Sequence, residues 1–411
     1  MKKWMGMAVV LAAAALTIGG CGKPQYEYIA AEDAGEMPES RKQEPPEIVL
    51  EEASTEADVI VLEADGVEGE KAEETKADGS ISLLFGGDVL LSDHVLNAYQ
   101  RSGGIGGVVD GGYRQAIEEA DFFMVNQEFP FSSRGTAAAD KQYTFRLPPE
   151  KVPMFRELGI DAVTLANNHA LDFGTEALLD TCATLDGAGI LHTGAGENLE
   201  KARKPVVAEL EGTRIGILGT TRVIPEAGWA AGKNHAGMLA TYDATATLET
   251  IRQMRAECDY VIVFVHWGIE RDEKPQEYQR TLGQQYIDAG ADLVIGSHPH
   301  VLQGIEYYKG RPIVYSLGNF VFGSSIPRTA LLRVELPIKP PVNPPEGQPA
   351  DVSADVSANR AADLRLLPGT SGAGYTRMLT EAGDVQVFYQ YMESISSGIS
   401  IDAQGKVTPG A

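Results

Sequence analysis

The chain is poor in cysteine, in long hydrophobic segments and in basic charge. Three cysteines in 411 residues show no spacing typical of a disulfide framework. The N-terminal apolar stretch Met5–Ile18 is too short to span a bilayer comfortably. The chain has 34 Lys and Arg against 58 Asp and Glu, a net charge of −24, and no basic stripe follows Ser80. The sequence therefore does not favour a groove that grips a long polyanion, and we expect no nucleic-acid partner.

The N-terminus has the features of a bacterial export signal. Lys2 and Lys3 precede the apolar stretch, and Ile18-Gly19-Gly20 places small residues before Cys21, as in the lipobox of lipoproteins. A short uncleaved anchor with an incidental cysteine is the alternative. We expect residues 1–20 to be a signal peptide and Cys21 to be diacylated, since two acyl chains anchor more stably than one. The predicted location is extracytoplasmic, at the outer face of the cell membrane.

The segment that follows Cys21 is strongly acidic. Residues 22–79 contain 18 acidic and 5 basic residues, which is −13 of the chain's −24. Their apolar residues are mostly Ala and Val, without a sustained period. Such a segment buries too little surface to offset the entropy cost of ordering it. We interpret residues 21–79 as a lipidated, disordered tether, with a short strand at Val59–Leu62 as an alternative.

From Ser80 onward, strand-like and helix-like segments alternate, which is typical of the α/β class with a sheet covered on both faces. Residues 80–336 are the expected domain, 337–363 a Pro/Ala-rich linker or excursion, and 364–411 terminal strands and a tail. Cys182 and Cys258 are expected to be buried free thiols. Helices are predicted at Lys151–Leu158, Thr175–Ala188, Ala244–Glu257 and Gln276–Ala289, and terminal strands at Leu364–Leu367 and Val385–Tyr391.

Six polar clusters each follow a strand-like apolar run. In an open α/β sheet the carboxyl ends of the strands share one edge, and ligands bind there. Four of the seven histidines lie in these clusters, so chance placement explains them poorly. We therefore expect a metal centre at that edge. The clusters are Gly86-Gly87-Asp88, Asn126-Gln127-Glu128, Asn167-Asn168-His169 with Asp172, His266-Trp267-Gly268, Gly296-Ser297-His298-Pro299-His300 and Ser316-Leu317-Gly318-Asn319.

Single clusters also have structural explanations. Asp88 could cap a helix, and Glu128 could be a solvated loop acid. His266 could be a buried histidine with one backbone partner. The pair His298 and His300 is harder to explain in this way, because the proline between them fixes the turn and aims both imidazoles from one place.

The donor types narrow the choice of metal. Imidazole, carboxylate and amide oxygen without thiolate suit Mn²⁺, Fe²⁺ or Zn²⁺. Six ligands are many for one tetrahedral zinc with an open position, but natural for two ions that share a carboxylate. His169 is the candidate general acid, with Asp172 as the second catalytic residue. The candidate ligands are Asp88, Glu128, Asn168, His266, His298 and His300.

The order of these motifs resembles the CapA family of bacterial poly-γ-glutamate capsule biosynthesis proteins, which is related to calcineurin-like metallophosphoesterases. The resemblance covers Ser80 to about Glu335. It implies a four-layer α/β/β/α sandwich with two central mixed sheets and a metal centre at the strand ends. The motifs that carry it are Gly87-Asp88, Asn126-x-Glu128, Asn167-Asn168-His169-x-x-Asp172, His266-Trp267-Gly268, His298-Pro299-His300 and Ser316-Leu317-Gly318-Asn319-Phe320.

The resemblance also implies individual roles. Asp88 resembles the aspartate ligand of the first strand, and Glu128 stands where those phosphoesterases usually have a bridging aspartate. Asn168 and His169 match the asparagine ligand and the adjacent catalytic histidine. The remaining matches are the isolated histidine ligand and the final histidine pair, which correspond to His266, His298 and His300.

One position departs from the phosphoesterase pattern. Those enzymes usually have a histidine two residues after the first aspartate, and here that position is Leu90. One metal position thereby loses a ligand, so we expect one or two ions. His94 could replace it only if the intervening loop folded favourably.

Two functions are consistent with these features. The first is a surface-anchored hydrolase of poly-γ-glutamate synthesis or export, which uses a divalent metal to cleave a phosphoester or a γ-glutamyl linkage. The second is a non-catalytic accessory or polymer-binding subunit of a membrane polyglutamate synthase. The absence of a basic stripe favours a local contact with one group of a substrate over a grip on a long acidic polymer.

Overall fold

The computed structural model describes residues 79–338 and 362–410. The predicted signal peptide, Cys21, the tether up to residue 78 and the alternative strand Val59–Leu62 lie outside the described residues. Most of the 337–363 segment also lies outside them. Among the described residues, no helix combines the length and apolar character needed to cross a membrane.

The larger of the two main sheets has ten strands within the described residues. Their bounds are β1 (Ser80–Val89), β2 (Phe122–Gln127), β3 (Ala162–Thr164), β4 (Leu191–Thr193), β13 (Asn319–Val321), β14 (Ser325–Pro337), β15 (Asp363–Gly372), β16 (Tyr375–Met378), β17 (Ile399–Ile401) and β18 (Lys406–Pro409). The order is β17-β18-β15-β14-β1-β2-β3-β4, with β13 beside β1 and β16 beside β15. β1 to β4 are parallel and β14 is antiparallel to β1, so the sheet is mixed.

The second main sheet has six strands in the order β11-β12-β10-β9-β7-β6. Their bounds are β6 (Val206–Leu210), β7 (Thr213–Thr221), β9 (Tyr260–His266), β10 (Leu293–Ser297), β11 (Leu302–Tyr308) and β12 (Arg311–Leu317). The four inner strands are parallel, and β6 and β11 are antiparallel edges, so this sheet is also mixed. A small third sheet pairs β5 (Ala195–Gly196) with β8 (Gly237–Met238).

The two main sheets pack face to face. Phe85 of β1 and Phe264 of β9 meet edge to face, with ring centroids 6.5 Å apart, in a core built from both sheets. Leu84, the neighbour of Phe85, instead enters a second core beneath α1 to α4. Alternate residues of β1 therefore enter different cores, which explains why its sequence is apolar without alternation.

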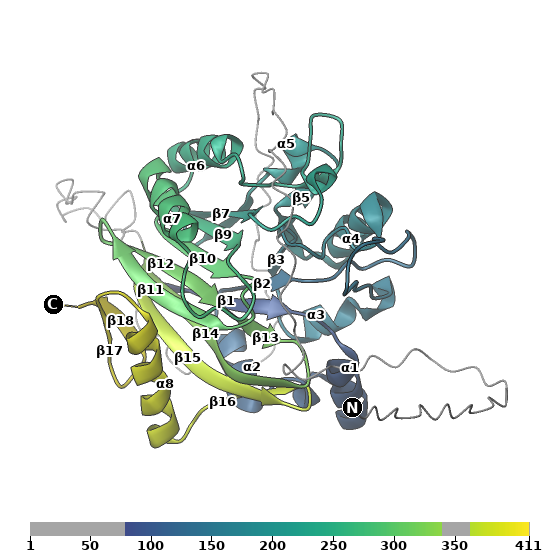
Figure 1. Cartoon of the computed structure of the whole chain (residues 1–411). Helices are drawn as coiled ribbons and strands as arrows, with labels where there is room; N and C mark the ends of the chain where they lie inside the picture. The colour runs from purple at the N-terminus through teal and green to yellow at the C-terminus, as the bar shows by residue number, and fades with distance from the viewer. Residues whose placement is uncertain (1–78, 339–361, 411) are drawn as a thin grey trace, which may run out of the picture. The chain divides into compact units, whose positions relative to one another are not determined.

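Helices cover the outer face of each sheet, as Figure 1 shows. On the ten-stranded sheet lie α1 (Asp93–Ser102), α2 (Gly111–Glu119), α3 (Pro153–Glu157) and α4 (Gly174–Ala188). On the six-stranded sheet lie α5 (Leu199–Ala202), α6 (Thr245–Glu257) and α7 (Glu277–Ala289). Short 3₁₀ turns occupy Ile105–Gly107, Pro149–Lys151 and Ala227–Trp229. The predicted four-layer α/β/β/α arrangement with two central mixed sheets is thus confirmed.

One sequence-based expectation is wrong. The sequence predicts a strand at Val385–Tyr391, but this segment lies within α8 (Ala382–Ile395). Phe388, Tyr389 and Met392 recur at helical spacing, and all three enter the core between the sheets. Their burial on one helical face outweighs the β-propensity of the segment. The expected strand Leu364–Leu367 lies within β15. Cys182 is partly buried, Cys258 is buried, and both are free thiols.

Candidate metal centre

The parallel strands of both sheets deliver polar residues to one place. Asp88 lies near the end of β1, and its backbone N–H donates across 2.8 Å to the carbonyl oxygen of Gly318, the residue between β12 and β13. A Cβ on Gly87 would come within 1.8 Å of that same carbonyl oxygen. Glycine is therefore required before Asp88, because only glycine lets the two backbones approach so closely.

Glu128 places a buried carboxylate at the centre of the site. It directly follows β2 and is fully buried, and neither of its carboxylate oxygens has a hydrogen-bond partner within the described residues. Oε1 lies 3.2 Å from His266 Nε2, and Oε2 lies 3.8 Å from His300 Nδ1. Burial, followed by the nearby Asp88 carboxylate, raises the pKa of Glu128 well above its usual range. A buried carboxylate without donors is costly, and a cation would remove that cost.

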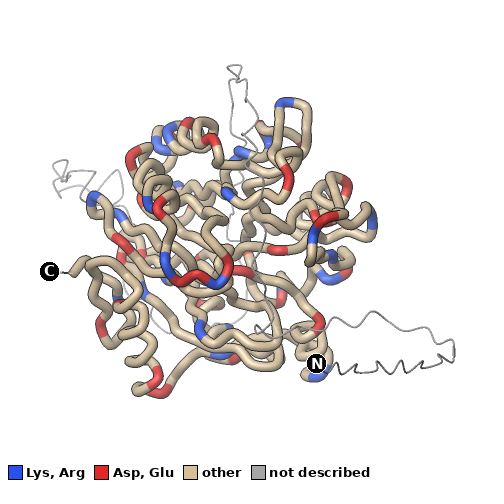
Figure 2. The backbone as a smooth tube through the Cα atoms, viewed as in Figure 1, with Lys and Arg blue, Asp and Glu red and all other residues tan. Residues whose placement is uncertain are grey.

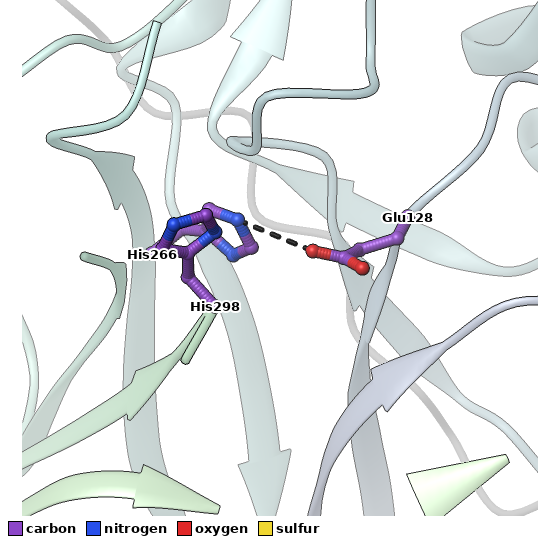
Figure 3. A group of neighbouring side chains, drawn as sticks. All are labelled: Glu128, His266 and His298. Carbon is purple, nitrogen blue, oxygen red and sulfur yellow. Dashed lines mark ion pairs between the residues drawn. The ribbon is translucent and has the colours of Figure 1, made fainter. Parts of the chain in front are cut away.

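Two histidines from the six-stranded sheet face Glu128, as Figure 3 shows. His266 ends β9, and its Nε2 lies 2.8 Å from Asn168 Oδ1 while its Nδ1 lies 3.0 Å from Ser297 Oγ. His298 follows β10 and is buried, and its Nδ1 has no partner among the described residues. Burial, then neighbouring imidazoles, lowers the pKa of both rings well below the usual value. Both are therefore neutral at pH 7, the form that binds metal.

The turn that carries His298 and His300 is conformationally unusual. Both residues have positive φ, 100° and 57°, which is uncommon for residues other than glycine and often marks functional sites. The His298 backbone N–H donates to Asp88 Oδ2 across 3.2 Å, which joins the turn to the ten-stranded sheet.

His300 is held by oxygen atoms on several sides. Its Nδ1 lies 2.8 Å from Asn319 Oδ1 and 3.4 Å from Asp88 Oδ2. Burial alone would lower the pKa of His300. The Glu128 and Asp88 carboxylates outweigh that effect and raise it to about 10.

The side chains form overlapping groups with the spacing of metal sites. Ligand atoms of Glu128, His266 and His298 lie within 4.8 Å of one another, and so do those of Asp88, Glu128 and His300. Glu128 belongs to both groups and presents a different oxygen to each. The Glu128 oxygens and His298 Nδ1, which have no hydrogen-bond partner in the described part of the chain, fit with these carboxylate and imidazole donors one or two divalent ions of the Mn²⁺, Fe²⁺ or Zn²⁺ type.

A second group of residues adjoins the ligands. His169 Nδ1 lies 2.7 Å from Asp172 Oδ2 and 2.9 Å from Lys141 Nζ. Lys141 also donates to Asp172 Oδ1 and to the Asn168 carbonyl. Burial lowers the pKa of Lys141 and of His169, and in both cases Asp172 opposes the shift. Since Nδ1 takes these contacts, Nε2 is the ring nitrogen that can face a substrate.

The structure brings the predicted residues together. Asn168 reaches the centre through its contact with His266, and Asp172 is buried behind His169. Leu90 packs in the core beneath the helices, and His94 is exposed on α1, so neither supplies a ligand there.

Two residues near the ligands were not predicted from the sequence. Lys141 comes from an irregular segment between β2 and α3, where no sequence pattern marks it. Glu270 lies close to His298 and His300, with ligand atoms again within 4.8 Å. Its place four residues after His266, in a loop at a strand end, was the available signal.

Comparison with known proteins gives the family. The model of "Bacterial capsule synthesis protein PGA_cap" matches residues 82–324. "PGA biosynthesis protein CapA" of Bacillus subtilis (strain 168) is 33% identical over 260 residues, which is 62% of this chain and 67% of that relative. "Capsule biosynthesis protein CapA" of Bacillus anthracis is 33% identical over 259 residues, 61% of each chain. A "Probable polyglutamine synthesis accessory protein" of Mycobacterium tuberculosis (strain H37Rv) is 33% identical over 49% of this chain and 55% of its own length.

Solved structures are more distant. The 5'-nucleotidase from Candida albicans SC5314 aligns with 69% of this chain and 51% of its own, at 10% identity and a TM-score of 0.36. The protein TT1561 of Thermus thermophilus aligns with 63% of this chain and 99% of its own, at 12% identity and a TM-score of 0.34. Scores this low support no conclusion about this chain.

The family match includes the site. Every candidate ligand, from Asp88 to His300, lies inside the matched segment, and that segment is more than half of the chain. The resemblance to CapA proteins is confirmed, and this chain belongs to the bacterial capsule synthesis protein family PGA_cap.

Proposed function

We propose that this chain is a metal-dependent hydrolase that acts in poly-γ-glutamate capsule synthesis or export at the outer face of the cell membrane. The bond cleaved is a phosphoester or a γ-glutamyl amide. The observation that carries the proposal is Glu128, a fully buried carboxylate that lies between the imidazoles of two histidines and whose two oxygens accept no hydrogen bond from the described residues. The Bacillus subtilis relative is named for PGA biosynthesis and the Bacillus anthracis relative for capsule biosynthesis, and both names support this pathway.

The ligands have separate tasks. Glu128, His266, His298 and Asn168 would hold one divalent ion, and Asp88, Glu128 and His300 would hold a second. Bound metal would supply Lewis acidity, which offsets negative charge on a substrate oxygen and makes water a better nucleophile. The side-chain amide of Asn126 donates to Asp88 Oδ1 across 2.8 Å and so keeps that carboxylate oriented.

His169 is placed to move a proton. Its Nδ1 can donate to Asp172 or accept from Lys141, so these two residues set the tautomer. When Asp172 accepts from Nδ1, the neutral ring offers Nε2 as a base that can take a proton from water. The imidazolium that results is balanced by Asp172 and can give the Nε2 proton to the leaving group, so one group serves first as base and then as acid. When Lys141 donates to Nδ1 instead, the neutral ring holds its proton at Nε2 and can only donate a hydrogen bond there.

Charge favours a local contact with the substrate. In Figure 2, Lys and Arg positions of the described residues alternate with Asp and Glu, and no continuous band of Lys and Arg is visible from this side. A long polyanion would find no extended basic track on this face. One phosphate or one terminal γ-glutamyl group at the metal centre is the contact that fits.

The proposal is tested with the purified full-length chain loaded with Mn²⁺ or Zn²⁺. Substrates are a phosphomonoester, a phosphodiester and γ-glutamyl oligomers. We expect turnover of one class, at least about a hundredfold loss in Glu128→Gln, and unchanged turnover in the exposed Asp93→Asn control. Metal-loaded protein with no turnover of any class would reject hydrolysis.

A second function has its own support. The Mycobacterium relative is named an accessory protein of polyglutamine synthesis, which fits a subunit that assists a membrane synthase. Retained polymer production in a cell whose only copy is Glu128→Gln would favour this role. Loss of production with that variant, restored by the wild-type chain, would favour catalysis.

A further inference from the structure

Glu270 lies beside the two histidines of the His298-Pro299-His300 turn. Ligand atoms of Glu270, His298 and His300 all lie within 4.8 Å of one another. Glu270 is exposed, His298 is buried, and His300 is half-buried. The carboxylate of Glu270 therefore meets the turn where the turn is open to solvent.

The loop that carries Glu270 is attached to this turn. The backbone N–H of Arg271, its neighbour, donates to Pro299 O across 2.7 Å. Gly268 has a φ of 101°, and a Cβ there would lie 2.9 Å from Pro299 Cγ. The Gly268 N–H donates to Tyr278 Oη across 2.8 Å. These contacts hold the loop against the turn, so Glu270 is not a freely moving surface acid.

One ion position lacks a ligand. Asp88, Glu128 and His300 supply three, whereas the divalent ions suited to this donor set take about four to six. Leu90 stands where a fourth protein ligand would be expected, and it is buried in the core beneath the helices.

The negative charges around this position also favour a bound cation. Asp88 and Glu128 form one group of potential ligands with His300, and Glu270 forms another with His300 and His298. Three acidic side chains therefore lie around the His300 ring. As an ordinary solvated loop acid, Glu270 would repel the two buried carboxylates. A cation between them turns that repulsion into shared attraction.

We propose that Glu270 is a ligand of the ion held by Asp88, Glu128 and His300, and that it replaces the donor missing at Leu90. This inference rests on the proposed metal centre. Because its ligand comes from an exposed loop, this second ion exchanges more readily than the ion at Glu128, His266 and His298. The two ions therefore bind in sequence, the enclosed one first.

The test uses the full-length chain, stripped with a chelator and titrated with Mn²⁺ alone. Calorimetry gives the affinities, and elemental analysis gives the ions bound per chain. We expect two steps in the wild type. Glu270→Gln should weaken the second step at least about tenfold and leave the first unchanged, because loss of supporting groups alone costs about 10- to 100-fold. Glu277→Gln, an equal charge change at the exposed start of α7, should match the wild type.

The outcomes separate this inference from the proposed function. Two unchanged steps in Glu270→Gln would overturn the role of Glu270 and leave the metal centre intact. A single step in the wild type that Glu270→Gln does not alter would do the same. A wild type that binds no Mn²⁺ would overturn both. The melting temperature of the metal-free Glu270→Gln variant should be equal to that of the wild type or slightly higher, because Glu270 is exposed and its charge repels the buried carboxylates.

Discussion

His266 Nε2 lies 3.2 Å from Glu128 Oε1, and this contact joins the two sheets of the sandwich. His266 ends a strand of the six-stranded sheet, and Glu128 follows a strand of the ten-stranded sheet. A metal between such residues would cross-link the two halves of the domain. Metal removal should therefore lower thermal stability as well as activity.

Replacing both histidines of the turn should remove bound metal. We expect His298→Ala with His300→Ala to retain less than about a tenth of the wild-type metal, because each candidate ion then loses at least one imidazole. Elemental analysis of the purified chains measures it. His94→Ala, on the exposed face of α1, is the control and should bind normally. A double variant with full metal content would contradict the ligand assignment.

His169→Ala should separate catalysis from metal binding. The ring is held through Nδ1 by Asp172, and it belongs to none of the candidate ligand groups found among the described residues. We expect normal metal content and a loss of hydrolysis of about 10²–10⁴-fold, the usual contribution of a general acid or base. Parallel measurement of kcat and of metal content decides it. Metal loss in this variant would make His169 a ligand instead.

Lys141→Met should destabilise the fold. Lys141 pairs with the fully buried Asp172, and its removal leaves that carboxylate with fewer compensating contacts. Because Asp172 still accepts from the Phe145 N–H, we expect a loss of about 3 kcal/mol, the lower end for breaking a buried pair. Urea denaturation measures it. The exposed Lys201→Met is the control, and an unchanged midpoint in Lys141→Met would show that the pair contributes little.

The two thiols of the folded domain should be unreactive at neutral pH. Burial raises the pKa of Cys182 to about 12, and it also raises the pKa of Cys258. A raised pKa keeps the thiol protonated, and the thiolate is the reactive form. We expect a thiol reagent to label neither residue in the native chain at neutral pH and both after denaturation. Rapid labelling of Cys182 in the native state would contradict this environment.

Cys21→Ser tests the proposed membrane anchor. The variant should leave the membrane fraction or stay unprocessed with its signal peptide, because the acyl chains have no attachment point. Membrane fractionation measures where the variant is located, and labelling with a radioactive fatty acid measures its acylation. Cys182→Ser should remain at the membrane, and unchanged lipid labelling of Cys21→Ser would reject the lipoprotein assignment.

The sequence by itself determined the layout of the site. Asp88, Glu128, His266 and His298 each follow or end a strand, and parallel strands place such residues on one edge. The apolar runs before them lack alternation because both faces of each sheet are covered. The spacing of apolar residues and the residue types within each segment were enough to predict the α/β class and four of the helices, because residues close together in the sequence carry those signals.

Only the tertiary structure decided which side chains complete the centre. Glu270 reaches the histidine turn through a loop that is hydrogen-bonded to Pro299, and Lys141 reaches Asp172 from an irregular segment. Neither residue belongs to a periodic sequence pattern that would predict its position. The same holds for Val385–Tyr391, where burial against both sheets selected a helix in place of the expected strand. Contacts between distant segments depend on packing and on loop paths, which local sequence patterns do not encode.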